Sequence, residues 1–264
     1  MAGVRLLTAG ESHGPALVSI LEGIPAGLSL DEEAIRRDLA RRQKGPGAGA
    51  RMAIETDSAR ILAGVMAGRT TGGPIALLIE NRDHENWKSR AIPPLTTPRP
   101  GHADLAGALK YGHDDFRITL ERASARETAM RVAAGAVCRQ FLAELGIRIG
   151  GYVAAIGSVT ANLVSLSFEQ RLEKAALQPT ACPDAAAAAE MEAAIRQAME
   201  AGETLGGIIE VIALGVAPGL GSFVQGDRRL DARLGAAILS VPAIKGVEIG
   251  PAFQNTRLPG TKVH

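Results

Sequence analysis

The segment from Ser124 to Gly146 constrains the fold more than any other part of the sequence, because it predicts a helix that is apolar on most of its faces. Ser124 and Glu127 have the spacing of a capping box, and Gly146 is a residue type that commonly ends a helix. One stripe of this helix is formed by Met130, Ala134, Val137, Phe141 and Leu145. The opposite side carries small residues, namely Ala133, Gly135 and Ala136. We therefore expect the helix to be buried nearly all round.

Two further helices are predicted from the same kinds of signal. A second capping box, from Ser29 to Glu32, opens a helix in which Arg42 continues the apolar stripe of Ile35 and Leu39. We therefore expect Arg42 to point toward the core or a cleft, whereas the other arginines of this helix are expected to be solvated. A third helix is predicted over residues 184–202, and its inward residues are expected to be Met191, Ile195 and Met199.

The predicted strands are short and do not alternate regularly with the helices. Apolar runs and turn residues favour strands over residues 60–65, 74–80 and 208–216. A doubly wound parallel sheet requires a βαβα rhythm that this order of elements lacks. No interior linker and no repeat interrupts the chain. The sequence therefore predicts an α+β layered fold and one domain over residues 1–264.

Composition and charge exclude several classes of protein. The 264 residues are 46% hydrophobic and 22% charged, and 29 basic against 28 acidic residues leave a net charge of +1. A chain with this balance has no global basic field for a nucleic acid or a membrane surface, and aromatic residues are too few, at 3%, for a base-stacking surface. We find no signal peptide and no span of about 18 apolar residues, so we expect a cytoplasmic protein.

The two cysteines and five histidines do not have the spacing of a metal site. Cys138 lies in a helical pattern and Cys182 in a loop beside a proline, which suits free thiols in a reducing compartment. No CxxC, HxH or HExxH pattern occurs, so we predict no metal. His13, between glycines and prolines, and His102, three residues after Arg99, each lie in a constrained turn. A loop histidine is usually an ordinary surface residue, so spacing alone leaves a catalytic role open for both.

The start of the Ser124 helix has the chemistry of an anion site. Unpaired N–H groups and the positive end of the dipole attract phosphate or carboxylate, and Arg122 and Arg126 add charged donors on either side. A capped helix with two solvated arginines explains the same residues equally well. Three glycines between Lys44 and Arg51 permit close approach to a ligand, but the loop matches no known phosphate-binding pattern and a plain loop is the favoured interpretation.

Taken together, these segments closely resemble the chorismate synthase family. The residues that carry the resemblance occur in family order over the whole chain, and they are Thr8–Pro15, Arg41–Gln43, Arg99–Asp104, Lys110–Tyr111, Leu120–Thr128 and Lys245–Gly250. The resemblance implies a sandwich of central helices packed between two antiparallel β-sheets, a homotetramer, and reduced FMN as cofactor. It implies the conversion of 5-enolpyruvylshikimate 3-phosphate to chorismate by anti-1,4-elimination of phosphate, in the shikimate pathway of aromatic amino acid biosynthesis.

The resemblance also implies roles for individual residues. His13 would protonate the leaving phosphate and His102 the reduced flavin. The residues that would bind the small-molecule substrate are Ser12, Arg42, Arg51 and Arg126. The residues that would contact the flavin are Arg99, Arg122, Ala123, Ser124, Pro242 and Ala243. Arg42 would also contact NADP, and the source of reduced flavin stays open between NADPH used by the protein itself and an outside reductase.

Two departures from the family pattern qualify what the resemblance implies. Ala48 stands in the Gly-rich loop where part of the family has an arginine, which removes one expected anion contact. The chain stops at His264, whereas family members continue through further flavin contacts and an aspartate proposed to help take the ring proton. From this we expect a domain that lacks the family's C-terminal segment, with impaired FMN binding and little turnover. A noncatalytic scaffold of the same fold is the alternative.

Overall fold

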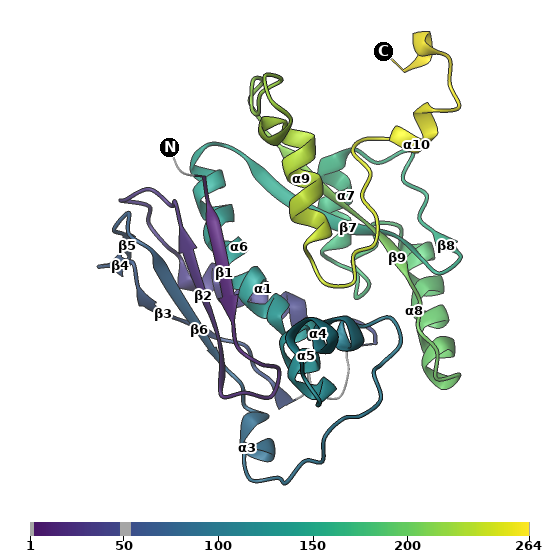
Figure 1. Ribbon diagram of the computed structural model, residues 1–264. Helices are drawn as coiled ribbons and strands as arrows, with labels where there is room; N and C mark the ends of the chain where they lie inside the picture. The colour runs from purple at the N-terminus through teal and green to yellow at the C-terminus, as the bar shows by residue number, and fades with distance from the viewer. Residues whose placement is uncertain (1–2, 48–53, 264) are drawn as a thin grey trace. The chain divides into compact units, whose positions relative to one another are not determined.

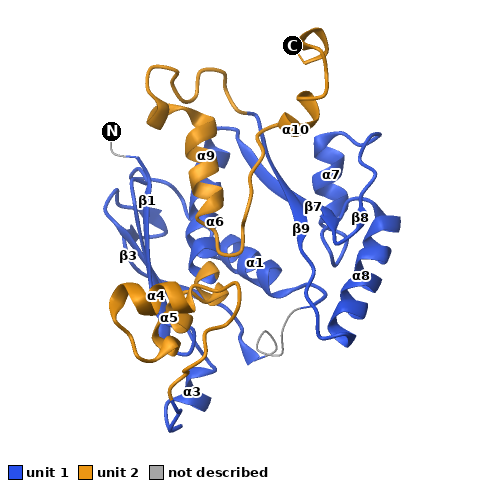
Figure 2. Ribbon diagram, turned by 45° about the vertical axis from the view of Figure 1, so that its right-hand side comes forward, with its two compact units in different colours: residues 1–93, 129–215 blue, residues 94–128, 216–264 orange. Residues whose placement is uncertain are grey.

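The computed structural model describes residues 3–47 and 54–263, and the chain divides into two compact units (Figures 1 and 2). Unit 1 comprises residues 1–93 and 129–215, and unit 2 comprises residues 94–128 and 216–264. Both β-sheets with three or more strands belong to unit 1, and unit 2 is built from helices and loops in its described part. The predicted α+β class is confirmed, because helices occur together with antiparallel sheets.

The first sheet of unit 1 has four antiparallel strands in the order β1-β2-β6-β3. These strands are β1 (Arg5–Ala9), β2 (Ala16–Glu22), β6 (Ile75–Glu80) and β3 (Ala59–Ala63), and a small hairpin of β4 (Val65–Met66) and β5 (Arg69–Thr70) follows β3. Alternate residues of the central strands β2 and β6 are buried, as expected for a sheet with one covered face. The predicted strands over residues 60–65 and 74–80 are therefore confirmed to within two residues.

Helices α1 (Glu32–Gln43) and α6 (Thr128–Glu144) share the main hydrophobic core with this sheet. The buried core residues of the two helices are Ile35, Leu39, Ala129, Met130, Ala133, Ala134, Ala136 and Val137. The expectation that α6 is buried nearly all round holds for its first three turns. It is wrong at the end of the helix, where Leu145 is 58% exposed, because periodicity marks a stripe but not where its covering neighbours stop.

The predicted start and end of α6 are set by local hydrogen bonds. Ser124 accepts a hydrogen bond from the N–H of Arg126 at 3.3 Å, and the chain then forms a 3₁₀ turn, η1 (Ala125–Glu127), before α6 begins at Thr128. Such 3₁₀ turns are common at helix ends. At the other end, Gly146 has φ 73° and the N–H of Ile147 donates to the carbonyl of Leu142 at 3.0 Å, which is a Schellman ending.

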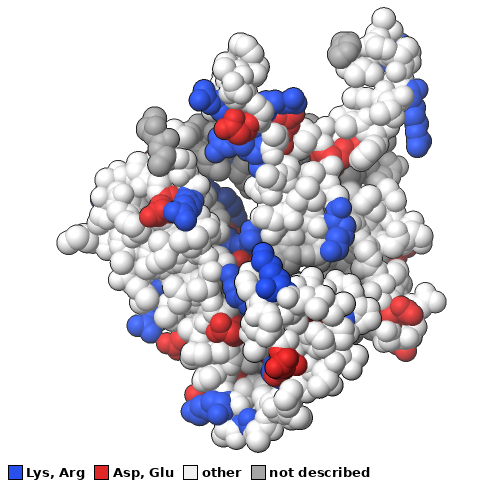
Figure 3. Space-filling view, in the orientation of Figure 1, with Lys and Arg blue, Asp and Glu red and all other residues white. Residues whose placement is uncertain are grey.

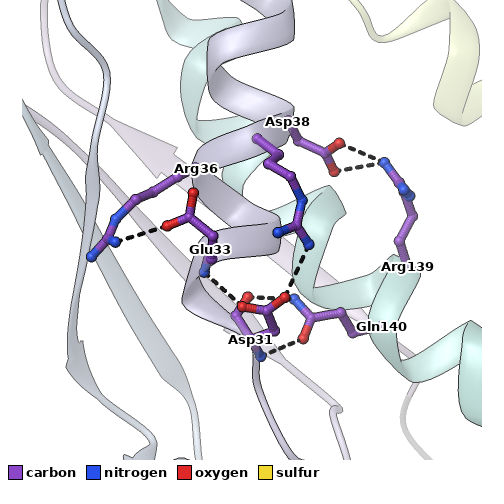
Figure 4. A network of polar contacts seen from close by, with 7 residues as sticks. Asp31, Glu33, Arg36, Asp38, Arg139 and Gln140 are labelled. Carbon is purple, nitrogen blue, oxygen red and sulfur yellow. Dashed lines mark hydrogen bonds and ion pairs between the residues drawn. The ribbon is translucent and has the colours of Figure 1, made fainter. Parts of the chain in front are cut away.

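Figure 4 shows how polar side chains join α1 to α6. Asp31 caps α1 by accepting from the N–H of Glu33 at 2.8 Å, so the predicted cap Ser29 is wrong by two residues. Gln140 of α6 bonds the N–H and the carbonyl of Asp31, at 2.7 and 3.1 Å. Arg139 donates to both carboxylate oxygens of Asp38 at 2.6 and 2.7 Å. These contacts fix α6 along α1.

The second sheet of unit 1 has three antiparallel strands in the order β8-β7-β9, and two helices contact it. The strands are β7 (Arg148–Ile156), β8 (Val159–Thr160) and β9 (Gly207–Leu214), and the helices are α7 (Phe168–Ala175) and α8 (Ala185–Glu200). The strand predicted over residues 208–216 and the helix over 184–202 are thus confirmed. Met191 is fully buried as expected, but Met199 is 60% exposed near the end of α8, so its predicted inward position is wrong.

Unit 2 contains three helices of seven to ten residues and several shorter turns in its described part. Its elements are α4 (Asp104–Tyr111), α5 (Phe116–Arg122), η1, η2 (Gly226–Arg228), α9 (Leu230–Leu239), α10 (Ala252–Asn255) and η3 (Gly260–Lys262). Helices α4 and α5 pack closely, because a Cβ atom at Gly107 would lie 2.3 Å from the Thr119 side chain. Asp115 caps α5 and also accepts from the N–H of Leu95, so the loop before α4 is tied to α5.

Several whole-chain properties agree with the composition. Cys138 and Cys182 are free thiols, and burial raises the pKa of both. Basic and acidic side chains are interspersed over the face drawn in Figure 3, as the small net charge leads one to expect. In the part of the chain that the structure describes, no helix has the length and apolar character that crossing a membrane requires.

Candidate active site

The turn between β1 and β2 carries two of the residues to which a role was assigned from sequence, Ser12 and His13. Gly10 opens the turn with φ 110°, and a Cβ atom there would lie 2.5 Å from the carbonyl oxygen of Ala16, so only glycine fits without a shift. Ser12 is buried, and the His13 side chain is 22% exposed. The backbone geometry therefore presents a partly accessible imidazole beside a buried hydroxyl.

A second segment, from Asn81 to Trp87, holds this turn in place. The N–H of Asn81 donates to the carbonyl of Pro15 at 3.0 Å, and its side-chain amide donates to the carbonyls of Glu11 and Gly14 at 3.2 and 2.8 Å. The Nδ1 atom of His84 lies 2.9 Å from the carbonyl oxygen of His13. Four contacts thus fix the backbone of the six-residue turn between β1 and β2, which makes it a rigid platform for its side chains.

The ring of His13 has two close neighbours on the same segment. It lies against the indole of Trp87, with ring centroids 4.0 Å apart and planes inclined by 34°. Its Nε2 atom lies 3.9 Å from Oδ2 of Asp83. Sequence reasoning missed both neighbours, because Asp83 and Trp87 lie 70 residues or more from His13 along the chain and no periodic pattern marks them.

Arg42 points inward, as its place on the apolar stripe of α1 predicts. Its side chain is only 13% exposed, and Nη1 lies 3.4 Å from Oδ2 of Asp57, whose side chain is completely buried. The neighbouring Gln43 bonds the carbonyl of Glu55 at 2.7 Å and the N–H of Asp57 at 3.2 Å. Two hydrogen bonds made by the side-chain amide of Gln43 therefore hold the segment 55–57 against the end of α1.

The same segment connects Arg42 to the His13 turn within unit 1. The carboxylate of Glu55 accepts from the N–H of Arg82 at 3.0 Å, and Arg82 Nη1 lies 3.2 Å from Oγ1 of Thr56. Arg82 directly follows Asn81, which bonds the turn. The structure thus links Ser12, His13 and Arg42 through one framework of hydrogen bonds. Arg51 and Ala48 lie outside the described residues.

In unit 2, Arg99 and His102 lie in a turn that closes on a buried carboxylate. The Nε and Nη2 atoms of Arg99 donate to Oδ2 and Oδ1 of Asp104 at 2.9 and 3.1 Å, and the Arg99 N–H also donates to Oδ2 at 3.1 Å. This forked hydrogen bond from Arg99 holds the pKa of Asp104 below its usual value, and Asp104 in turn raises that of Arg99, with a smaller contribution from Glu121 of α5. His102 is exposed at the tip of the turn.

The remaining residues with predicted roles in unit 2 lie at two chain bends. Arg122 ends α5, Ala123 follows it, and Ser124 caps η1, whose Arg126 is buried. The anion site predicted at Ser124 would thus lie where two short helical segments meet. Pro242 and Ala243 follow α9, and Ala243 has φ 71°, a left-handed conformation that is costly for a residue with a Cβ atom. Strained positions of this kind cluster at functional sites.

A separate concavity of unit 1 has a volume of about 340 Å³. None of the residues to which the sequence assigns a catalytic or binding role lines it. It lies between α1, α6 and the start of β7, and its lining includes Ala34, Asp38, Ala136, Arg139 and Arg148. Asp38 and Arg139 already bond each other there, as Figure 4 shows. Across the described residues, no group of three or more metal-ligating side chains is assembled.

Comparison with known proteins gives one consistent result. The family model for chorismate synthase matches residues 4–264. Chorismate synthases of Symbiobacterium thermophilum and Chlorobaculum tepidum are 54% and 52% identical to the chain over 99% of its length, and the chain covers 71% and 70% of their lengths. A crystal structure of chorismate synthase superposes with a TM-score of 0.85 at 46% identity, over 100% of this chain and 74% of the other.

Proposed function

The chain belongs to the chorismate synthase family of phosphate-releasing lyases in the shikimate pathway, and from this premise we propose how its residues carry the reaction. The reaction converts 5-enolpyruvylshikimate 3-phosphate to chorismate by anti-1,4-elimination of phosphate. The observation that carries the proposal is the framework around His13, which holds a partly accessible imidazole on a turn fixed by Asn81 and His84.

We propose that arginines bind the anionic groups of the substrate. The substrate carries one phosphate and two carboxylates, and charge-assisted hydrogen bonds from guanidinium groups are the usual way to hold such groups. In unit 1, Arg42 is assigned this role because its guanidinium is mostly buried and fixed beside Asp57. Ser12 is assigned to the same ligand because its buried hydroxyl lies on the His13 turn. Arg51 and Arg126 are proposed as further substrate contacts.

We propose that His13 protonates the leaving phosphate. Imidazole and phosphate both change protonation state near neutral pH, so a histidine is suited to this proton transfer. The rigid turn fixes the backbone that carries the imidazole, and accurate positioning is what a proton donor needs from the protein. His102 is assigned the corresponding proton transfer to the cofactor, since its turn is held by the Arg99–Asp104 pair while its own side chain stays exposed.

We propose that residues of unit 2 bind the flavin. Arg122 and Ser124 supply a cation and a hydroxyl at a junction of helical segments, and the strained backbone at Ala243 is of the kind that clusters at functional sites. We assign Arg99, Ala123 and Pro242 to the same cofactor. These residues would hold reduced FMN, which would supply electron density for the elimination and would not be consumed. Arg42 is the proposed NADP contact.

We propose for the complete assembly a sandwich of central helices between two antiparallel sheets, a homotetramer, and a cytoplasmic location. The first turns of α6, in which no residue is exposed, support the central-helix arrangement. The two free cysteines agree with a reducing compartment.

An anaerobic assay tests the proposed reaction directly. The chain is mixed with 5-enolpyruvylshikimate 3-phosphate and reduced FMN, and phosphate and chorismate are measured in the same samples. We expect both products in equal amounts, at the low turnover that the sequence predicts, and neither when oxidised FMN replaces reduced FMN. Absence of both products with reduced FMN, from a chain whose folding is verified by circular dichroism, would refute the proposal for this chain.

A further inference from the structure

We infer that Asp83 is a positioning residue that holds the ring of His13, with Trp87 as its partner; this inference rests on the proposed role of His13. Asp83 is 8% exposed, and its carboxylate is surrounded by groups of its own segment and of the His13 turn. Oδ1 accepts from Nδ2 of Asn86 at 2.9 Å, and Oδ2 accepts from Nε1 of Trp87 at 3.1 Å. Oδ2 also faces Nε2 of His13 at 3.9 Å.

These contacts define the position of the imidazole from two sides. The indole of Trp87 covers one face of the His13 ring at 4.0 Å, and the hydrogen bond from its Nε1 to Asp83 fixes the plane of the indole. The carboxylate lies at the edge of the imidazole that carries Nε2. A ring bounded by an aromatic face and a carboxylate has few orientations open to it. Asp83 therefore acts on His13 both directly and through Trp87.

The arrangement matters for proton transfer because misplacing a catalytic group by about 1 Å can cost about 100-fold in rate. His13 lies on a turn whose backbone is fixed by Asn81 and His84, but those contacts do not reach its ring. Asp83 and Trp87 supply the contacts to the ring itself. The segment 81–87 therefore fixes both the backbone of the turn and the side chain of His13.

Asp83→Asn is the most informative substitution at this position. Both carboxylate oxygens accept hydrogen bonds, from Asn86 and from Trp87, whereas an amide has one accepting oxygen and one donating NH₂ group. The single amide oxygen accepts from only one of these donors, and no negative charge then faces Nε2 of His13, so asparagine holds the indole and the imidazole less firmly even if Asn86 turns its own amide over. Glu85→Gln is the matched control. It removes a carboxylate from the short helix α3 (His84–Trp87), which directly follows Asp83, and that carboxylate pairs with the exposed Lys88.

The first experiment measures the position of the ring without turnover. Trp87 is the single tryptophan of the chain, so nuclear Overhauser contacts between selectively labelled tryptophan and histidine rings report on the His13–Trp87 pair. We expect this contact in the wild type and in Glu85→Gln, and its loss or marked weakening in Asp83→Asn. Its absence from the wild type, or its full retention in Asp83→Asn, would overturn the inference even if Asp83→Asn were unstable, since the wild-type measurement stands alone.

The second experiment is a double-mutant cycle on turnover with His13→Gln. If Asp83 acts through His13, Asp83→Asn lowers kcat about 10- to 100-fold with little change in KM, and has no further effect once His13 is replaced. An equal loss in both backgrounds would show that Asp83 has only a structural role. A wild-type chain that forms no chorismate would refute the proposed function, and the ring contact would still decide the inference.

Discussion

At the scale of single residues, the most consequential contacts are those between buried carboxylates and the groups they fix. Asp57, Asp83 and Asp104 each have a fully or largely buried side chain and each bonds or faces a residue to which a role is assigned. A buried carboxylate needs charged or hydrogen-bonding partners, because burying an unpaired charge costs free energy. The polar framework of the candidate site therefore depends on carboxylates to which no substrate or cofactor contact is assigned.

The Arg99–Asp104 pair gives a prediction for the pH dependence of stability. Arg99 lowers the pKa of Asp104 in the folded protein, so the pair adds stability above the usual pKa of an aspartate, about 3.9, and this stability is lost as the pH falls through the lowered folded-state pKa. Asp104→Asn should therefore reduce the free energy of unfolding at pH 7 by about 1–3 kcal/mol, a range reduced from that of fully buried pairs because the Arg99 side chain is 39% exposed.

Urea denaturation at a series of pH values measures this effect. The difference between wild type and Asp104→Asn should be constant near neutrality and should shrink as the pH falls below about 4. Asp231→Asn is the matched control, since Asp231 pairs with Arg229 on the surface of the same unit and its loss should change stability much less. A difference for Asp104→Asn that grows as the pH falls would contradict the assignment.

The structural positions of residues were predictable from sequence where the signal is local. Ser124 as a cap and Arg42 as an inward arginine were both found, because capping and helical periodicity depend on residues within a few positions. Asp83 and Trp87 were missed because their contacts to His13 form only when two strands bring distant turns together. Asp104 was missed although it lies five residues from Arg99, because their pairing depends on the bend that the intervening Pro-Gly makes.

At the scale of elements, close packing of α4 against α5 holds the turn of His102 in unit 2. Gly107 faces Thr119 so closely that a Cβ atom would lie 2.3 Å from its side chain. Gly107→Ala should destabilise the protein by about 1–2 kcal/mol, because overpacking outweighs the gain in helix propensity. Gly135→Ala in α6 is the matched control, since no atom lies within 4 Å of the added Cβ, and it should stabilise by about 0.5–1 kcal/mol.

Thermal unfolding of both variants separates packing from helix propensity. The melting temperature should fall for Gly107→Ala and rise slightly for Gly135→Ala. A rise in both would mean that α4 and α5 are not in close contact in solution. The helices and strands themselves were largely predictable, but the exposure of Leu145 and Met199 was not, because amphipathic periodicity does not reveal where the covering layer ends.

At the scale of the whole molecule, the sequence places local positive charge in a nearly neutral chain. With a net charge of only +1, the chain must bind an anionic ligand through individual arginines and not through an overall positive field. Arginines with assigned roles occur in each of the two units. This distribution suits a small, strongly anionic substrate better than an extended polyanion, which requires a continuous basic face. The irregular order of helices and strands made the α+β class predictable, and the resemblance of the motifs made the family and its lyase reaction predictable.

The central claim is that His13 donates a proton to the phosphate that leaves. The most direct measurement is the rate of phosphate release in a single anaerobic turnover with saturating reduced FMN, compared between the wild type and His13→Gln. Loss of a general acid should lower this rate by about 10²- to 10⁴-fold, with substrate affinity largely retained. An unchanged rate of phosphate release in His13→Gln would contradict the account.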